Sequence, residues 1–249
     1  GEVSVHGAKN SALPLMAASL LWRGECVLHN CQHLSDVDVS ARILRHLGCT
    51  VHWQGGSLVI DPRAVSQCDI PDGLMREMRS SIVFLGAILA RTGRAVLSFP
   101  GGCELGPRPI DLHLRALRKM GARIAEDYGC LSCSVQGLLR GAAIGLSFPS
   151  VGATENILLA AATAEGTTVI TNAAREPEIC DLAAFLNRCG AHVSGAGGST
   201  IVVEGVKKLS GCEHRVIPDR IAAATFMSAA AATGGCIRLN HVLPAHLEP

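Results

Sequence analysis

The fold is decided by the stretch Ile82-Val83-Phe84-Leu85-Gly86-Ala87-Ile88-Leu89-Ala90-Arg91-Thr92-Gly93-Arg94-Ala95-Val96-Leu97-Ser98-Phe99. Its first part, Ile82–Arg91, predicts a helix that is apolar all round, as expected of a helix buried on all sides. Gly93 follows as a helix-ending residue. Ala95–Phe99 then predicts a short strand. A buried helix that returns at once as a strand is the basic element of this chain.

The same order of helix, glycine and strand recurs about every seventy residues. The other three copies are helices Ala12–Trp22, Asn156–Ala164 and Ala222–Thr233, glycines Gly24, Gly166 and Gly234, and strands Cys26–His29, Thr167–Thr171 and Cys236–Asn240. After each of the first three strands come a loop, an amphipathic second helix and a strand pair. An acidic residue stands near the start of each second helix (Asp38, Asp111, Asp181), where it complements the helix dipole. The chain therefore contains three βαβαββ-like units and the start of a fourth.

This repeat predicts an α/β (α+β) fold in which helices pack inward and sheets partly face solvent. The chain begins at Gly1 rather than Met and stops just after a strand-like run, so we expect both ends to be cut.

Composition excludes several classes of protein. Apolar residues make up 48%, aromatic residues 3%, and the net charge is +1, which argues against nucleic acid and anionic membrane as partners. The longest nearly charge-free run, 221–237, is too short for a membrane span. Eleven scattered cysteines and no signal peptide indicate free thiols in the cytoplasm. The single CxxC, Cys130 to Cys133, lies in an expected strand and is interpreted as structural, so we expect no metal.

Four segments just before the apolar helices carry residues suited to anions. They are Gly7-Ala8-Lys9-Asn10, Met78-Arg79-Ser80-Ser81, Ser150-Val151-Gly152-Ala153-Thr154 and Pro218-Asp219-Arg220. Helix N-termini offer free N–H groups and partial positive charge. Ordinary capping by Ser and Thr is the alternative for any one of them. Several equivalent termini together favour an anion-binding centre.

The stretch Pro100–His113 is rich in Gly and Pro, which predicts a loop, and it holds one thiol, Cys103. That thiol is either reactive or a small buried filler. Asp111 is either an acceptor for an imide N–H, such as uracil presents, or a helix cap. His113 either packs or supports the loop. Glu176-Pro177-Glu178 occupies the equivalent loop of the third unit, as capping charge or near the active centre.

Together these motifs resemble the UDP-N-acetylglucosamine enolpyruvyl transferase family, within the EPSP synthase-like superfamily. The resemblance rests on residues 7–14, 100–103 with 106–113, 150–154, 172–178 and 218–220, which run in family order. It implies the inside-out α/β barrel of that superfamily. It also implies that residues 9–216 form a first domain of three units. Residues 217–249 would then begin a second domain whose remainder is absent, and the strand segment 1–8 would belong with that second domain.

The resemblance implies the chemistry as well. The 3-hydroxyl of UDP-N-acetylglucosamine attacks C2 of phosphoenolpyruvate, and phosphate leaves from a tetrahedral intermediate, in the first committed step of peptidoglycan synthesis. Cys103 is implied as general acid and as the thiol that fosfomycin alkylates, and Lys9 as the second catalytic residue. The implied substrate-binding residues are Asn10, Arg79, Arg108, Pro109, Ile110, Asp111, Leu112, Ser150, Val151 and Gly152, with His113, Glu176, Glu178 and Arg220 in support. No cofactor is implied.

Two departures from the family pattern qualify this. Phe148 stands where some members have Lys, which removes one diphosphate contact. The length covers only the first domain, so we expect little or no activity from the chain alone. The competing functions are the related 3-phosphoshikimate transferase and a non-catalytic fragment that binds a UDP-sugar.

Overall fold

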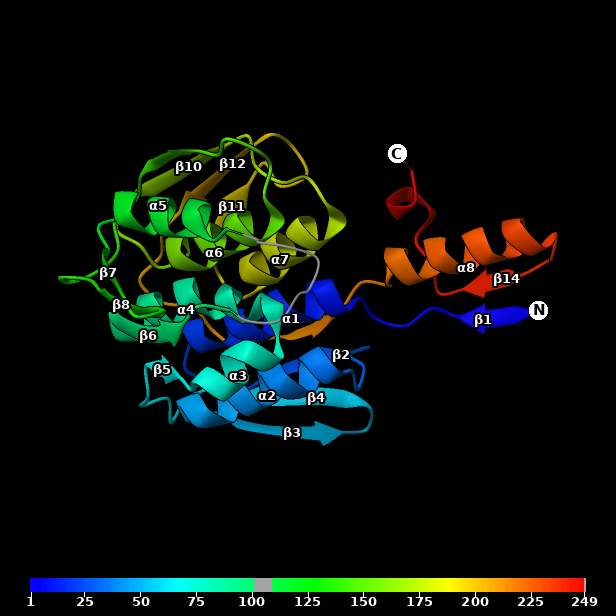
Figure 1. Ribbon diagram of the computed structural model, residues 1–249, viewed down its shortest axis with the longest axis horizontal. Coiled ribbons are helices and arrows are strands. Elements are labelled where there is room, and N and C mark those ends of the chain that lie inside the picture. Colours follow the sequence, from blue (N-terminus) through cyan, green and yellow to red (C-terminus); the bar gives the residue numbers. More distant parts are fainter. Residues whose placement is uncertain (101–108, 249) are drawn as a thin grey trace.

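The protein is described by a computed structural model that covers residues 1–100 and 109–248. Three four-stranded sheets surround a group of helices, and a smaller part with one helix and one two-stranded sheet lies beside them (Figure 1). The predicted α/β arrangement, with helices inside and sheets outside, is confirmed. The strands form separate sheets rather than one closed barrel in the described part of the chain.

Each large sheet has the same plan, a parallel edge strand followed by three strands in antiparallel pairs. The first sheet, in the order β13-β2-β4-β3, consists of β13 (Glu213–Arg215), β2 (Cys26–His29), β4 (Ser57–Asp61) and β3 (Thr50–Gln54). The second, β5-β6-β8-β7, consists of β5 (Asp69–Ile70), β6 (Arg94–Ser98), β8 (Cys130–Ser134) and β7 (Arg123–Asp127). The third, β11-β12-β10-β9, consists of β11 (His192–Ser194), β12 (Thr200–Glu204), β10 (Thr167–Thr171) and β9 (Ala143–Gly145).

Two parallel strand pairings join segments that are far apart in the sequence. β13 comes after the third unit but pairs in parallel with β2 of the first. The N-terminal β1 (Glu2–Ser4) pairs in parallel with β14 (Arg238–Asn240), near the other end of the chain. Short-range patterns in the sequence do not reveal these two pairings, because each joins residues more than a hundred positions apart.

The helices are of two kinds. The inner helices are α1 (Lys9–Ala18), α4 (Phe84–Thr92) and α6 (Val151–Ala161), extended by the 3-10 turns η1 (Ser19–Leu21) and η2 (Arg79–Val83). The amphipathic helices are α2 (Ser35–Leu47), α5 (Asp111–Lys119) and α7 (Pro177–Arg188), and the short α3 (Asp72–Glu77) precedes η2. The inner helices form the centre of the core, where residues such as Leu15, Leu85 and Leu158 have no exposed surface.

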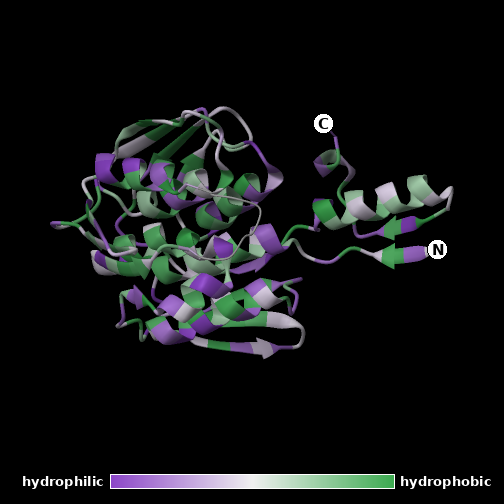
Figure 2. Cartoon of the chain, viewed as in Figure 1, coloured by the Kyte–Doolittle hydropathy of each residue, from purple (hydrophilic) through white to green (hydrophobic). Residues whose placement is uncertain are grey.

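The fourth apolar helix differs from this pattern. α8 (Arg220–Thr233) buries only Ala223, and Ile221 and Met227 are about half exposed. The expectation that all four first helices are buried is therefore wrong for α8. Its ribbon is coloured largely apolar in Figure 2, but beyond its first turn, in the described structure, it lies beside β1, β14 and the 3-10 turn η3 (Pro244–His246) and not against the core.

Of the four glycines predicted to end the apolar helices, two act as helix caps and two do not. Gly93 and Gly234 cap α4 and α8 in the left-handed region, with φ of 71° and 63°. α1 and α6 instead end several residues before Gly24 and Gly166.

The three inner helices begin at or close after the segments 7–10, 78–81 and 150–154, so the fold brings the candidate anion-binding residues to one end of the core. No helix among the described residues has both the length and the apolar character needed to cross a bilayer.

Candidate functional site

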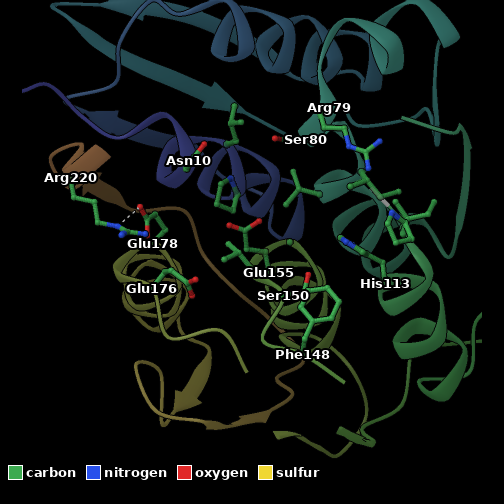
Figure 3. A pocket seen from close by; sticks show the side chains of 18 residues that line it. Asn10, Arg79, Ser80, His113, Phe148, Ser150, Glu155, Glu176, Glu178 and Arg220 are labelled. Atoms are coloured by element: carbon green, nitrogen blue, oxygen red, sulfur yellow. Dashed lines mark hydrogen bonds and ion pairs between the residues drawn. The ribbon is translucent and has the colours of Figure 1, made fainter. Parts of the chain in front are cut away.

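A cavity of about 580 Å³ lies where the N-terminal ends of the inner helices converge (Figure 3). Its wall includes residues from α1, η2, the segment before α5, α6, α7 and α8. The predicted site residues that line it are Asn10, Arg79, Pro109, Ile110, His113, Ser150, Val151, Gly152, Glu176, Glu178 and Arg220. The fold thus brings together eleven residues that are spread over more than two hundred positions of sequence.

The start of α6 provides the most regular part of this wall. Ser150 is its N-cap, and the Ser150 Oγ accepts a hydrogen bond from the Ala153 N–H at 3.3 Å. The Thr154 hydroxyl donates to the Ser150 carbonyl at 2.8 Å. Gly152 has no side chain, which allows the His113 ring to lie directly against it. The first N–H groups of a helix carry partial positive charge, so an anion is the natural ligand here.

Two arginines face the cavity from different elements. Arg79, at the start of η2, donates from Nη1 to the Pro100 carbonyl at 3.3 Å. Arg220, at the start of α8, binds the carboxylate of Glu178 at 3.1 Å. One cation therefore adjoins the segment that leads into the loop of Cys103, and the other is bound to an acid on α7.

Three acids gather on the wall opposite Arg79: Glu155, Glu176 and Glu178 (Figure 3). Glu155 is 7% exposed and has no hydrogen-bond or ion-pair partner among the described residues. Burial, together with the smaller effects of the neighbouring Glu178 and Glu176, raises the pKa of Glu155 to about 8. Near neutral pH this carboxyl group is therefore mostly protonated, which limits repulsion between the pocket and an anionic ligand.

The match to a protein family extends over the whole fold. The family model described as EPSP synthase (3-phosphoshikimate 1-carboxyvinyltransferase) matches residues 1–248. The chain belongs to the EPSP synthase family. Within it, the chain is 56% identical over its full length to UDP-N-acetylglucosamine 1-carboxyvinyltransferase 2 of Caldanaerobacter subterraneus subsp. tengcongensis, and 53% identical to UDP-N-acetylglucosamine 1-carboxyvinyltransferase 1 of Symbiobacterium thermophilum. It spans 60% and 57% of the lengths of these two relatives.

Solved structures of the family share the fold. The enolpyruvyl transferase NikO from Streptomyces tendae superposes with a TM-score of 0.81 at 24% identity, over 92% of this chain and 55% of that one. EPSP synthase from Acinetobacter baumannii superposes with a TM-score of 0.74 at 25% identity, over 97% of this chain and 56% of that one. In each case this chain matches little more than half of the known structure.

Three residues predicted from the family pattern lie beside the cavity rather than on its wall. Lys9 Nζ binds the Asp36 carboxylate at 2.7 Å. Asp111 binds Arg115 at 3.0 Å, one turn along α5. Leu112 is buried in the core. Lys9 and Asp111 are thus both engaged with charged partners, whereas Cys103 and Arg108 lie outside the residues that the structure describes.

Other wall residues were not among the predicted site residues, although Leu13 and Pro14 lie within the motif 7–14. Glu155 is the most consequential, because it is the one charged residue in α6 and it is buried. A charged residue in such a run is itself a signal, since acids are rarely buried without a reason. Leu13, Pro14, Ser80, Ile82 and Val83 complete the wall beside the α1 and η2 termini.

The cysteines of this family member do not form a metal site in the described ranges, where no cluster of three His, Cys, Asp or Glu side chains is suited to a metal. Cys130 and Cys133 both lie in β8, as expected for a structural CxxC. Burial raises the pKa of Cys133 to about 11 and that of Cys31 and Cys49 to about 12. These thiols therefore stay protonated and unreactive near neutral pH.

Proposed function

We propose that this chain provides the nucleotide-sugar and phosphoenolpyruvate half-site of a UDP-N-acetylglucosamine 1-carboxyvinyltransferase, a transferase of class EC 2.5.1.7. The observation that carries the proposal is the cavity at the converging helix starts, lined by Asn10, Arg79 and Ser150. Support comes from relatives of that name at 53% and 56% identity. The reaction joins the 3-hydroxyl of the sugar to C2 of phosphoenolpyruvate and releases phosphate, the first committed step of peptidoglycan synthesis.

The charges of the cavity suit these substrates. Phosphoenolpyruvate and a nucleoside diphosphate are both multiply anionic, and helix termini with a nearby guanidinium stabilise such charge in a site shielded from water. In this proposal Ser150, Val151 and Gly152 bind the diphosphate, and Pro109 and Ile110 line the uridine site with Arg108, Asp111 and Leu112. Asn10, with Lys9, contacts phosphoenolpyruvate and the sugar, and Arg79 binds the anionic substrates.

Cys103 and Lys9 have the catalytic roles in the proposal. Cys103 donates a proton toward C3 of phosphoenolpyruvate as charge develops at C2. Lys9 stabilises the anionic substrate, for which its ammonium group exchanges the Asp36 carboxylate for the ligand. Glu178 and Arg220 hold the α7 and α8 termini together beside this centre, and His113 and Glu176 complete the wall.

We also propose the domain division. Residues 9–216 make up a three-unit domain, and residues 217–249 with the segment 1–8 belong to a second domain. The β1–β14 pairing and the exposure of α8 support this division. Because the sugar-activating base and further arginines of the family would come from that second domain, little or no turnover is expected of the chain alone. The thiol-rich composition, with the cysteines of the described part all free, supports a reducing, cytoplasmic setting.

Calorimetry tests the proposal most directly. UDP-N-acetylglucosamine should bind to the 249-residue chain, while shikimate 3-phosphate should not. Binding of shikimate 3-phosphate alone would instead favour the related transferase. A phosphate-release assay with both substrates distinguishes the third possibility, since binding without turnover is the expected result for the chain alone. Turnover at the rate of an intact family enzyme would overturn the domain division.

Alkylation by fosfomycin tests the role of Cys103. In the presence of UDP-N-acetylglucosamine, peptide mass spectrometry should find the adduct on Cys103 and not on the ten other cysteines. Cys236 is exposed, and the variant Cys236→Ala is a matched control that should leave the labelling unchanged. The variant Cys103→Ala should abolish it. An adduct on Cys236 instead of Cys103 would contradict the assignment.

A further inference from the structure

A chain of hydrogen bonds fixes the position of one proton at the edge of the cavity. It runs from the backbone of α4 through Asn156 of α6 to His113 of α5. The Gly86 N–H donates to Asn156 Oδ1 at 2.7 Å. Asn156 Nδ2 lies 2.9 Å from the Ile82 carbonyl and 2.8 Å from His113 Nδ1. All three contacts are buried.

The orientation of the Asn156 amide follows from the first two contacts. A backbone N–H can only donate, so the amide atom that faces Gly86 must be the oxygen. A backbone carbonyl can only accept, so the atom that faces Ile82 must be the nitrogen. The second hydrogen of that nitrogen then points at His113 Nδ1. Exchange of the amide oxygen and nitrogen would break both backbone contacts.

The tautomer of His113 follows in turn. Because Asn156 donates to Nδ1, that nitrogen must be the bare acceptor, and the ring proton is on Nε2. A second proton on the ring would place two donors face to face inside the core. Burial, opposed by Asp111 and aided by Arg79, lowers the pKa of His113 to about 4. Geometry and burial therefore both favour the neutral ring.

The protonated nitrogen lies at the start of α6. A Cβ atom added to Gly152 would be 3.1 Å from His113 Cε1 and 3.5 Å from Nε2, so this edge of the ring lies directly against Gly152. Figure 3 shows the His113 ring pointing from α5 toward the cavity. His113 is only 7% exposed, and no atom in the described ranges accepts from Nε2. Nε2 is not among the fully buried, unpartnered side-chain atoms of the described residues, and His113 lines the cavity, so a ligand oxygen in the cavity can accept from this N–H.

We propose that His113 is a positioning residue that binds a phosphate oxygen of the nucleotide ligand as a neutral imidazole, with its single proton fixed on Nε2 by Asn156. This inference rests on the proposed function for the identity of the ligand. Its chemistry is that of an anionic oxygen acceptor, because the Nε2–H group and the first N–H groups of α6 converge on the same place. Asn156 acts through His113 and touches no substrate.

Nitrogen NMR of the histidine rings tests the proton position without any ligand. The spectrum of the ¹⁵N-labelled chain, with the His113 signals assigned by their loss in His113→Gln, should show a bare Nδ1 and a protonated Nε2. Both should stay unchanged between pH 5 and 8. A proton on Nδ1, or titration of His113 within that range, would overturn the proposal whatever the ligand is.

A pair of variants then tests the role in binding. His113→Asn retains an acceptor for Asn156 but has no donor that reaches the cavity, whereas His113→Gln retains a donor at the place of Nε2. The affinity for UDP-N-acetylglucosamine should fall about tenfold in His113→Asn, and His113→Gln should recover most of that loss. His52→Asn, on the exposed surface of β3, is the matched control and should bind as the wild type does.

The two parts of the inference fail in different ways. Equal affinities of His113→Asn and His113→Gln would overturn the role of Nε2–H in binding. A wild-type chain that does not bind UDP-N-acetylglucosamine would overturn the proposed function and, with it, the phosphate assignment. In that case the NMR result still decides whether Asn156 fixes the ring proton.

Discussion

The guanidinium of Arg220 lies with Nε 3.1 Å from a carboxylate oxygen of Glu178, and this pair joins the first turn of α8 to the first turn of α7. The Glu178 side chain is only 4% exposed, and that of Arg220 is 32% exposed. Removal of the arginine leaves a buried carboxylate unpaired beside two other acids. Arg220→Met should therefore lower the free energy of unfolding by about 1–3 kcal/mol, measured by urea denaturation.

The control for this pair is a double-mutant cycle. Glu178→Gln removes the charge that Arg220 compensates, so Arg220→Met should cost less in that background than in the wild type. Arg215→Met, at an exposed position of β13, is the matched arginine control and should change the stability by less than about 0.5 kcal/mol. Identical losses for Arg220→Met with and without Glu178 would contradict a coupled pair.

Glu155 should make stability depend on pH. Its pKa is raised to about 8 by burial and by Glu178 and Glu176, while a glutamate in an unfolded chain titrates near ~4.3. Between these values the folded chain retains a proton that the unfolded chain has released, so stability falls as the pH rises. Glu155→Gln has no such proton. It should exceed the wild type in free energy of unfolding at pH 8, by on the order of 4 kcal/mol, and the difference should shrink toward pH 5.

Thermal or urea unfolding at several pH values measures this difference. Glu165→Gln, at an exposed position, is the matched control, and its stability relative to the wild type should stay nearly constant over the same range. A difference for Glu155→Gln that is equally constant would show that Glu155 is ionised in the folded chain at all these pH values.

The order of elements was largely predictable, because the helix, glycine and strand pattern repeats locally. Asp181 shows where such reasoning stops. Its position near the start of α7 predicts a dipole-complementing acid, yet in the structure it is buried, accepts from His214 Nε2 at 2.8 Å and also accepts from the Ser11 hydroxyl. Ser11 is 170 positions away. Local sequence patterns indicate that an acid favours a helix start, but only the packed structure determines which distant donors surround it.

The candidate site shows the same division. Motifs at helix starts predicted most of the cavity wall, because each carries its own capping chemistry. Glu155 was missed because its importance depends on what packs around α6. Similarly, the sequence predicts that α8 is apolar, but its exposure depends on which other segments are present to cover it.

Ser150 allows capping and ligand binding to be separated. Its Oγ accepts from the Ala153 N–H at 3.3 Å, so Ser150→Ala should lower the free energy of unfolding by about 1 kcal/mol. Ser150→Asp should retain that stability because Asp also caps helices, but its negative charge should repel a diphosphate. Denaturation together with calorimetry of UDP-N-acetylglucosamine checks both effects. If Ser150→Asp binds the ligand as tightly as the wild type, the start of α6 is a capped helix end and not an anion site.

Gly86 gives a test in which helix propensity and packing predict opposite results. Alanine is favoured over glycine within a helix by up to about 1 kcal/mol. A Cβ atom at Gly86 in α4, however, would lie 2.4 Å from the Asn156 backbone oxygen and 2.9 Å from its Oδ1. Gly86→Ala must therefore push α4 and α6 apart, and it should lower the free energy of unfolding by about 1–3 kcal/mol. It should also disturb the bond that orients Asn156 toward His113.

Gly73, in the short helix α3, is the matched control. A Cβ atom there meets nothing within 4 Å, so Gly73→Ala should be neutral or stabilising, as propensity alone predicts. Urea denaturation of the two variants, with the ¹⁵N spectrum of His113 recorded for each, measures both effects together. If Gly86→Ala is as stable as Gly73→Ala and leaves the His113 signals unchanged, then α4 and α6 do not approach closely enough for Asn156 to be held by the Gly86 N–H.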